Sequence, residues 1–247
     1  MPSLQRSPQS NQNESMVPAI VINPNRIALV LASLVFLFIT LAVVGQLSVW
    51  VYGFDPESKF VLYFNVEAEK NPPALFAGLQ LLFAATTAWV ASKIDIVMWR
   101  RRYWQILAAG LAWMSFDEVF RMHERLIEPM RALLGGGDLG MFTYAWVVPA
   151  IFVVSIVGLL YTKFLLGLPS ETGLWLFASG AVFVGGAVGL EMVGGWYWSQ
   201  MGNTLTQSLI VITEEAMEFS GICLFIFVVL RFLQKEQANG LLKFSAL

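Results

Sequence analysis

The sequence predicts an all-α fold, a polytopic transmembrane bundle of about six spanning helices with both termini on the cytoplasmic side. Of its 247 residues, 57% are hydrophobic and only 13% are charged, whereas about 25% are charged in a typical soluble protein. Several apolar runs reach the roughly 18 residues that identify a membrane-spanning helix. The single cysteine, Cys223, excludes a disulfide framework and a thiolate metal cluster. We therefore expect a lipid bilayer as the main partner and no nucleic acid.

The apolar runs divide the chain into a tail, a membrane domain and a second tail. We predict spans at 27–52, 73–94, 103–128, 142–166, 172–198 and 205–232. Each is long enough to cross a hydrocarbon core of about 30 Å at 1.5 Å per residue. The polar segment 1–25 has the composition of a disordered tail, the membrane domain covers 26–233, and 234–247 forms a short C-terminal tail.

Positive charge predicts the orientation of this bundle, because Lys and Arg concentrate in cytoplasmic connections. Lys93 and the arginines at 100–102 follow the second span, Lys163 follows the fourth and Arg231 ends the sixth. The connection between the fifth and sixth spans has no positive residue. We therefore place both termini inside and the fifth connection outside.

The first outer connection, about 54–72, is the longest, and we predict a short helix in it that lies in the membrane interface. Asp55 followed by Pro56 has the pattern of an N-cap with proline at the first helical position. Glu67 and Glu69 follow that helix, and we expect them to be solvated loop charges.

Acidic residues inside the spans are the most informative feature for function. An uncompensated carboxylate near the bilayer centre costs roughly 2.5–3.5 kcal/mol even on insertion scales. Six such residues lie in apolar stretches of three predicted helices: Asp117, Glu118, Glu191, Glu214, Glu215 and Glu218. Counted along their helices, all lie roughly 10–15 Å below the outer interface. This shared depth predicts one pocket rather than scattered charges.

Helical periodicity groups these residues further. Residues 117, 121, 124 and 128 recur at the spacing of one helix face, and Gln207, Glu214 and Glu218 form a polar stripe on the last span. The fifth span is rich in glycine, and Gly185 and Gly189 have the four-residue spacing that permits close helix packing. We expect this packing to bring Glu191 towards its neighbours.

Carboxylates this close need a counter-charge, which arginine, protons or a metal ion can supply. Because Arg121 and Arg125 are too few for the acids, we predict a divalent metal ion, without distinguishing Mn, Fe, Zn, Mg or Ca. The predicted ligands are Asp117, His123, Glu124, Glu191, Glu214 and Glu218. Glu118 and Glu215 are the predicted acid–base residues. The alternative is that salt bridges and protonation satisfy these groups and that their role is structural.

Two segments carry a resemblance to a family. The loop NVEAEKNPP (65–73) has a Glu-x-Asn-x-Pro pattern, and SFDEVFRMHERL (115–126) contains an Asp-Glu pair followed by His-Glu. With Glu191 and TEEAMEFSG (213–221), these segments resemble a group of uncharacterised bacterial multipass membrane proteins. The resemblance implies that Glu69 and Asn71 join the third-span acids in one site, and it implies no activity. A bacterial inner membrane is the expected location.

Three functions fit these observations. The first is a metal-dependent enzyme acting on a lipid or other amphipathic substrate from the outer leaflet. The second is a cation or proton transporter, because intramembrane acids mark such pathways, although the sequence shows no inverted repeat. The third is a non-catalytic membrane assembly partner. Substrate, reaction and oligomeric state are not specified by the sequence.

Overall fold

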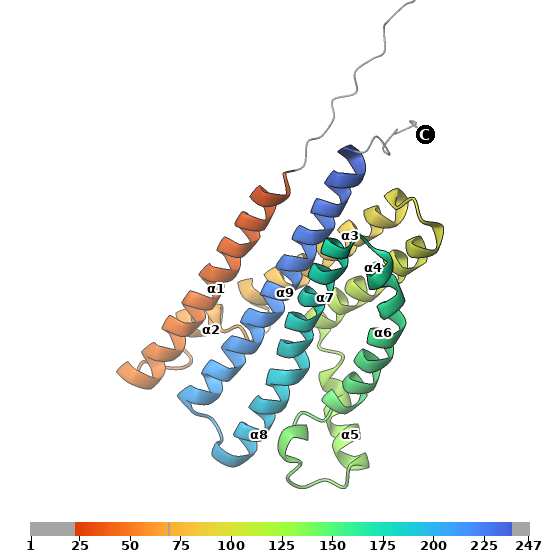
Figure 1. Ribbon diagram of the computed structural model, residues 1–247. Coiled ribbons are helices and arrows are strands. Elements are labelled where there is room, and N and C mark those ends of the chain that lie inside the picture. The colour runs from red at the N-terminus through yellow and green to blue at the C-terminus, as the bar shows by residue number, and fades with distance from the viewer. Residues whose placement is uncertain (1–22, 69, 239–247) are drawn as a thin grey trace, which may run out of the picture.

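The computed structural model describes residues 23–68 and 70–238, and every regular element in that part of the chain is a helix (Figure 1). The long helices are α1 (Pro24–Tyr52), α3 (Pro72–Ile94), α4 (Met98–Phe120), α6 (Val147–Gly167), α7 (Ser170–Val184), α8 (Glu191–Met201) and α9 (Leu205–Ala238). The short ones are α2 (Lys59–Phe64), α5 (Ile127–Leu133) and the 3₁₀ turns Glu124–Leu126 and Gly140–Phe142. A π-helical segment, η3 (Gly185–Leu190), joins α7 to α8. Most of the predicted N-terminal tail and the end of the C-terminal tail lie outside the described residues.

Five helices of the described chain are long and apolar enough to cross a membrane, which supports an integral membrane protein. They are Pro24–Trp50, Pro72–Ile94, Val147–Gly167, Ser170–Met201 and Leu205–Glu236. α4, the predicted third span, has sufficient length but is too polar to join them. The described ends of α1 and α9 lie at one end of the bundle (Figure 1). We call this the terminal end; its side of the membrane stays a prediction.

Local sequence signals explain where α1 and α3 begin. Asn23 Oδ1 accepts a hydrogen bond from Arg26 N at 3.2 Å, and Asn71 Oδ1 accepts one from Ala74 N at 3.1 Å. Each cap is followed by proline at the start of the helix, where the missing N–H has no cost. Asn71, which the resemblance placed in the site, thus caps α3, while Glu69 lies outside the described residues.

The predicted helix start at Asp55 is wrong. Asp55 Oδ1 accepts a hydrogen bond from Glu57 N at 2.9 Å, which makes a turn, and α2 begins only at Lys59. A side-chain turn of this kind competes with the capping geometry that the same residue types provide.

α9 is the central helix, with α1, α3, α7 and η3 packed around it. Its C-terminal half is buried by aromatic and aliphatic contacts, among them Phe225, Ile226 and Phe232. α1 and α6 are mostly exposed apolar helices, as expected for helices that face lipid. α4 packs along α3 and contacts α6 near the terminal end, where Tyr103 and Trp104 meet Phe164.

The α3–α4 turn is tied to the α6–α7 turn by a buried ion pair at the terminal end. Asp95 is fully buried, and its Oδ1 accepts hydrogen bonds from Arg100 Nη2 at 2.6 Å and Nε at 3.1 Å. Trp104 Nε1 donates to Asp95 Oδ2 at 3.0 Å, and Arg100 Nη1 donates to Gly167 O at 2.7 Å. Arg100, which the sequence assigned to the charged cytoplasmic rim, is therefore a packing residue.

The predicted span 103–128 is interrupted near its outer end. α4 ends at Phe120, and Arg121 adopts a left-handed conformation with φ of 46°. The chain then turns through 121–126 into α5, so residues 117, 121, 124 and 128 do not share a helix face. Glu128 lies on α5, and its predicted place in that stripe is wrong.

Candidate functional site

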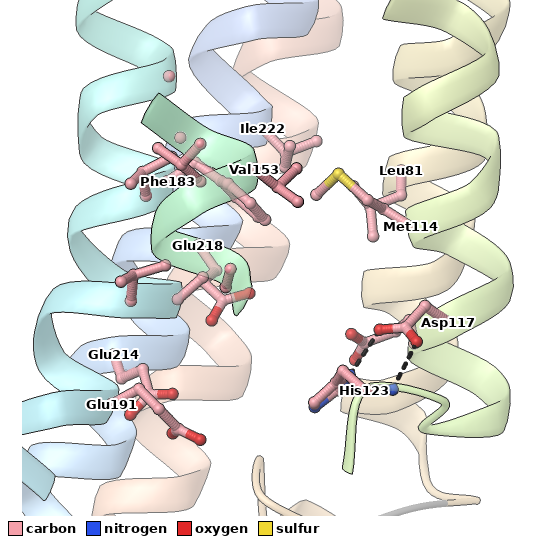
Figure 2. Close-up of a pocket in the computed structure, with 18 of the residues that line it drawn as sticks. Leu81, Met114, Asp117, His123, Val153, Phe183, Glu191, Glu214, Glu218 and Ile222 are labelled. Atoms are coloured by element: carbon pink, nitrogen blue, oxygen red, sulfur yellow. Dashed lines mark hydrogen bonds and ion pairs between the residues drawn. The ribbon is translucent and has the colours of Figure 1, made fainter. Parts of the chain in front are cut away.

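A cavity of about 950 Å³ lies between α4 and the helices α6, α7, η3, α8 and α9. Figure 2 places Asp117 and His123 on one side of it and Glu191, Glu214 and Glu218 on the other. Its lining includes eight acidic residues, Glu67, Asp117, Glu118, Glu124, Glu191, Glu214, Glu215 and Glu218. Arg121 and His123 are the basic residues among its described lining. The predicted site residues thus line one cavity, on two opposite walls.

On the α4 wall, the chain reverses direction after the end of α4, and this reversal places His123 next to Asp117. Asp117 Oδ1 accepts a hydrogen bond from His123 N at 2.9 Å, and its Oδ2 lies 2.5 Å from His123 Nδ1 (Figure 2). Arg121 forms an ion pair with Glu124. The left-handed backbone at Arg121 reverses the chain and makes these contacts possible. Two of the eight acids therefore have basic partners within the same short segment.

On the opposite wall, Glu191 and Glu214 face each other between α8 and α9 (Figure 2). Trp146 Nε1 donates to Glu191 Oε1 at 2.8 Å. Glu214 is buried, with 9% of its surface exposed. Neighbouring carboxylates repel each other unless a cation or a proton lies between them. This wall therefore suits a cation or a proton.

Glycine allows η3 and α7 to pack closely against α9. A Cβ on Gly186 would lie 2.8 Å from Glu214 O, and one on Gly221 would lie 2.8 Å from Phe183 N. Gly189, in contrast, has open space at its Cβ position. The predicted role of glycine packing holds, but Gly186 rather than Gly189 makes the contact. Because η3 is π-helical, it also changes the angle at which Glu191 leaves the helix.

The predicted acid–base residues lie one on each wall, Glu118 on α4 and Glu215 on α9. Both line the main cavity, and with Glu218 they also line a small adjoining hollow. Gln80 of α3 lines the same hollow, and its Nε2 donates to Phe219 O at 3.0 Å. Glu118 thus approaches Glu215 and Glu218 from another helix, which its separation from them in sequence does not reveal.

The surroundings of the cavity mouth also shift the pKa values of two further residues. Glu67 is exposed there, yet the surrounding protein removes enough water to raise the pKa of its carboxyl; Arg121 lowers that pKa and Glu191 raises it. Burial, with smaller contributions from Glu191, Glu67 and Glu214, raises the pKa of Tyr144 to about 12. Both groups are therefore biased towards their neutral, protonated forms.

Four of the residues that line this site were not predicted as part of it: Glu67, Tyr144, Trp146 and Gln207. Glu67 was assigned to a solvated loop, and Tyr144 and Trp146 were given no place in the predicted site. Gln207 belonged to the polar stripe of the last span, which was the signal that could have included it. The sequence prediction included only acidic residues and histidine, and it left out neutral polar residues on the same helix face.

Among residues 23–68 and 70–238, no three His, Cys, Asp or Glu side chains are close enough together to hold a metal ion. The six predicted ligands are split between the walls, with Asp117, His123 and Glu124 on one and Glu191, Glu214 and Glu218 on the other. Metal binding therefore stays a proposal, which would require an ion held mainly by one wall or a closer approach of both.

The fold and the site define the class: an all-helical integral membrane protein with an acid-lined cavity inside its bundle. The match to a family model covers residues 27–233, from α1 to near the end of α9. The chain belongs to this family, which is described as a domain of unknown function, DUF8692. No curated protein and no solved structure matches the chain.

Proposed function

We propose that this membrane protein binds a divalent cation among the carboxylates of its cavity and acts as a metal-dependent enzyme on an amphipathic substrate. The observation that supports this is the cavity itself, with eight acids and one arginine at one end and apolar side chains along the rest. Carboxylates that have no basic partner bind cations or protons. An apolar extension beside them suits a molecule with a polar end and a hydrocarbon body.

The acids of α8 and α9 are the better candidates for holding the ion. Glu191, Glu214 and Glu218 face the cavity together (Figure 2), whereas Asp117 and Glu124 already have His123 and Arg121 as partners. Oxygen ligands suit Mg, Ca or Mn, and the addition of His123 would suit Fe or Zn. A bound ion would lower the pKa of a water ligand. Glu118 and Glu215 would exchange a proton with it.

Metal analysis of the full chain in phosphatidylcholine nanodiscs tests this proposal. We expect about one divalent ion per chain after incubation with Mn, Fe, Zn, Mg or Ca, and none in Glu214→Gln plus Glu218→Gln. Glu171→Gln is the matched control, because Glu171 pairs with Lys235 on the surface, away from the cavity. Failure of the wild-type protein to take up any of the five ions would overturn the proposal.

Transport and a structural role are the competing functions. An ion pathway finds less support, because the cavity continues towards the terminal end along apolar side chains such as Leu107, Phe164 and Leu176. The ion pairs of the α4 wall favour a structural role for that wall alone. Ion flux in proteoliposomes under a gradient would distinguish transport from catalysis.

A further inference from the structure

The lining of the cavity indicates the chemistry of the molecule that it takes. Carboxylates that are ionised only accept hydrogen bonds. Of the donors at the acidic end, Trp146 is bonded to Glu191 and His123 to Asp117, and Tyr144 and the Gln207 amide supply further donors. Arg121 is paired with Glu124. A ligand with donors therefore finds many acceptors here, whereas an anionic ligand finds mainly negative charge.

Gln207 provides a second, independent observation. Its side chain lines the cavity, only 4% of the residue is exposed, and its Oε1 has no hydrogen-bond partner in the described part of the chain. An acceptor buried without a partner costs about 1–3 kcal/mol. It lies on α9 two turns before Glu214, on the same helix face. Oε1 itself has almost no exposed surface, so a rotation of the amide towards the cavity would let a donor on the ligand satisfy it.

Charge leads to the same conclusion. Within the described chain, Asp117 and Glu124 have basic partners, which leaves six of the eight acids, and a divalent ion would offset the charge of only two of these. A ligand that is itself a cation is therefore compatible with a bound metal ion and reduces the repulsion further.

The apolar part of the cavity sets the size of the hydrocarbon body. Glu118 and Leu107 on α4, and Glu214 and Phe225 on α9, are each eleven residues apart and line the same cavity. At 1.5 Å per residue both walls extend about 16 Å beyond the acids, which is about the length of an extended chain of a dozen carbons.

The cavity is also reached from the lipid side. Trp113 on α4 and Val153 on α6 line it, and both are 59% exposed on the surface of the bundle. α4 and α6 meet at the terminal end, where Tyr103 packs against Tyr161 and Phe164. The opening at Trp113 and Val153 lies on the other side of that contact, where an alkyl chain can enter from the hydrocarbon core. A ligand with such a chain needs no path through water.

We infer that the amphipathic molecule of this cavity is a long-chain primary amine, whose ammonium group lies among Gln207, Glu214 and the neighbouring acids and whose chain of about a dozen carbons lies along Leu107, Met114 and Phe225. This inference rests on the proposed function, of which it names the substrate class. An ammonium group offers three donors and a positive charge, which matches both the unpartnered oxygen and the excess of acid.

Binding of dodecylamine, dodecanol and dodecanoate to the full chain in phosphatidylcholine nanodiscs tests this inference. The melting temperature is followed at pH 7, with ligands compared at equal mole fraction in the bilayer. We expect dodecylamine to half-saturate the protein at a mole fraction at least about tenfold below that of dodecanoate, with dodecanol between them. Equal binding of the three, or stronger binding of dodecanoate, would overturn the inference.

Two variants locate the ligand. Gln207→Leu should weaken dodecylamine binding roughly tenfold because a charge-assisted hydrogen bond is lost. Gly180→Leu should also weaken it, because Gly180 lines the cavity and a side chain there enters open space. Gly110→Leu is the matched control, since Gly110 has the same open surroundings but does not line the cavity. Equal effects of the last two variants would contradict the location.

The amine-binding experiment and the metal-binding experiment can fail independently of each other. Metal-loaded protein that prefers dodecanoate supports metal binding and overturns the amine. Protein that takes up no metal but selects dodecylamine, with the loss in Gln207→Leu, overturns the metal-dependent enzyme and supports the amine site.

Discussion

Asp95 and Glu214 are both buried carboxylates of the same helical bundle, at opposite ends, and their surroundings differ completely. Asp95 accepts hydrogen bonds from Arg100 and Trp104, and Arg100 in turn reaches Gly167 O. The Glu214 carboxyl lies beside another carboxyl, that of Glu191 (Figure 2), and has no ion pair within the described residues. The first arrangement satisfies every charge internally, which is what stability requires. The second leaves charge to be satisfied from outside, which is what a binding site requires.

Breaking the satisfied pair should have the largest effect. Asp95→Asn leaves the Arg100 guanidinium buried without its counter-charge, so we expect a loss of about 3–5 kcal/mol in the free energy of unfolding. Thermal unfolding in nanodiscs measures this loss. Arg102→Gln is the control, because no ion pair of Arg102 is seen in the described chain. A loss below about 1 kcal/mol would show that the Asp95 pair is not what holds the two turns together.

Trp146→Phe should have the next largest effect, because it removes the donor to Glu191 while retaining an aromatic ring beside His123. A hydrogen bond to a charged acceptor contributes about 1.5–3 kcal/mol. We expect a stability loss of that size together with weaker cation binding. Unchanged stability would mean that Glu191 finds another donor.

The acidic wall should respond in the opposite direction. Glu214→Gln removes a carboxyl that faces other carboxyls, so we expect unfolding stability to be unchanged or higher by about 1 kcal/mol, and cation binding to be lost. The same thermal and metal measurements decide this. A loss of several kcal/mol would place Glu214 in the same class as Asp95 and would remove the contrast between the two ends.

The smallest expected effect is that of Glu67, and it depends on pH. Its folded-state pKa is raised by the surrounding protein, with Arg121 opposing and Glu191 adding to the shift. The protonated form is thus favoured on folding, and stability falls as pH rises from the unfolded-state pKa, about 4.3, through the raised folded-state value. Glu67→Gln should remove this decline and be slightly more stable than wild type at pH 7. Parallel stability–pH curves for the two proteins would contradict the assignment.

Local rules in the sequence predicted much of the fold but only half of the arrangement at the site. The starts of α1 and α3 follow from an asparagine cap before proline, which operates within four residues. The break at Arg121 has no such signal, because FRMHER contains neither glycine nor proline. The helix ends where Asp117 contacts His123, and hydrophobic periodicity in the sequence does not predict such a contact. The outer end of the third predicted span, 121–128, was assigned to a helix for that reason.

The positions of the acids along the predicted helices correctly indicated that they line one cavity, because carboxylates buried in an apolar bundle must cluster around a shared polar space. These positions did not reveal how the acids divide between two walls, since that depends on which helices pack together. The contact of Gly186 with the backbone of Glu214 sets one wall, and the chain reversal sets the other. Gln207 and Trp146 were passed over because neutral donors and acceptors matter only once their partners are known.

The chain reversal at Arg121 has a consequence for biogenesis. The contact between Asp117 and His123 joins residues six apart, so this wall can form as soon as the α3–α4 hairpin has left the ribosome. The opposite wall joins Trp146 to Glu191, forty-five residues apart, and is completed only when α9 has been made. A nascent chain therefore carries half of its cavity into the membrane early, and the last helix to be inserted closes the other half.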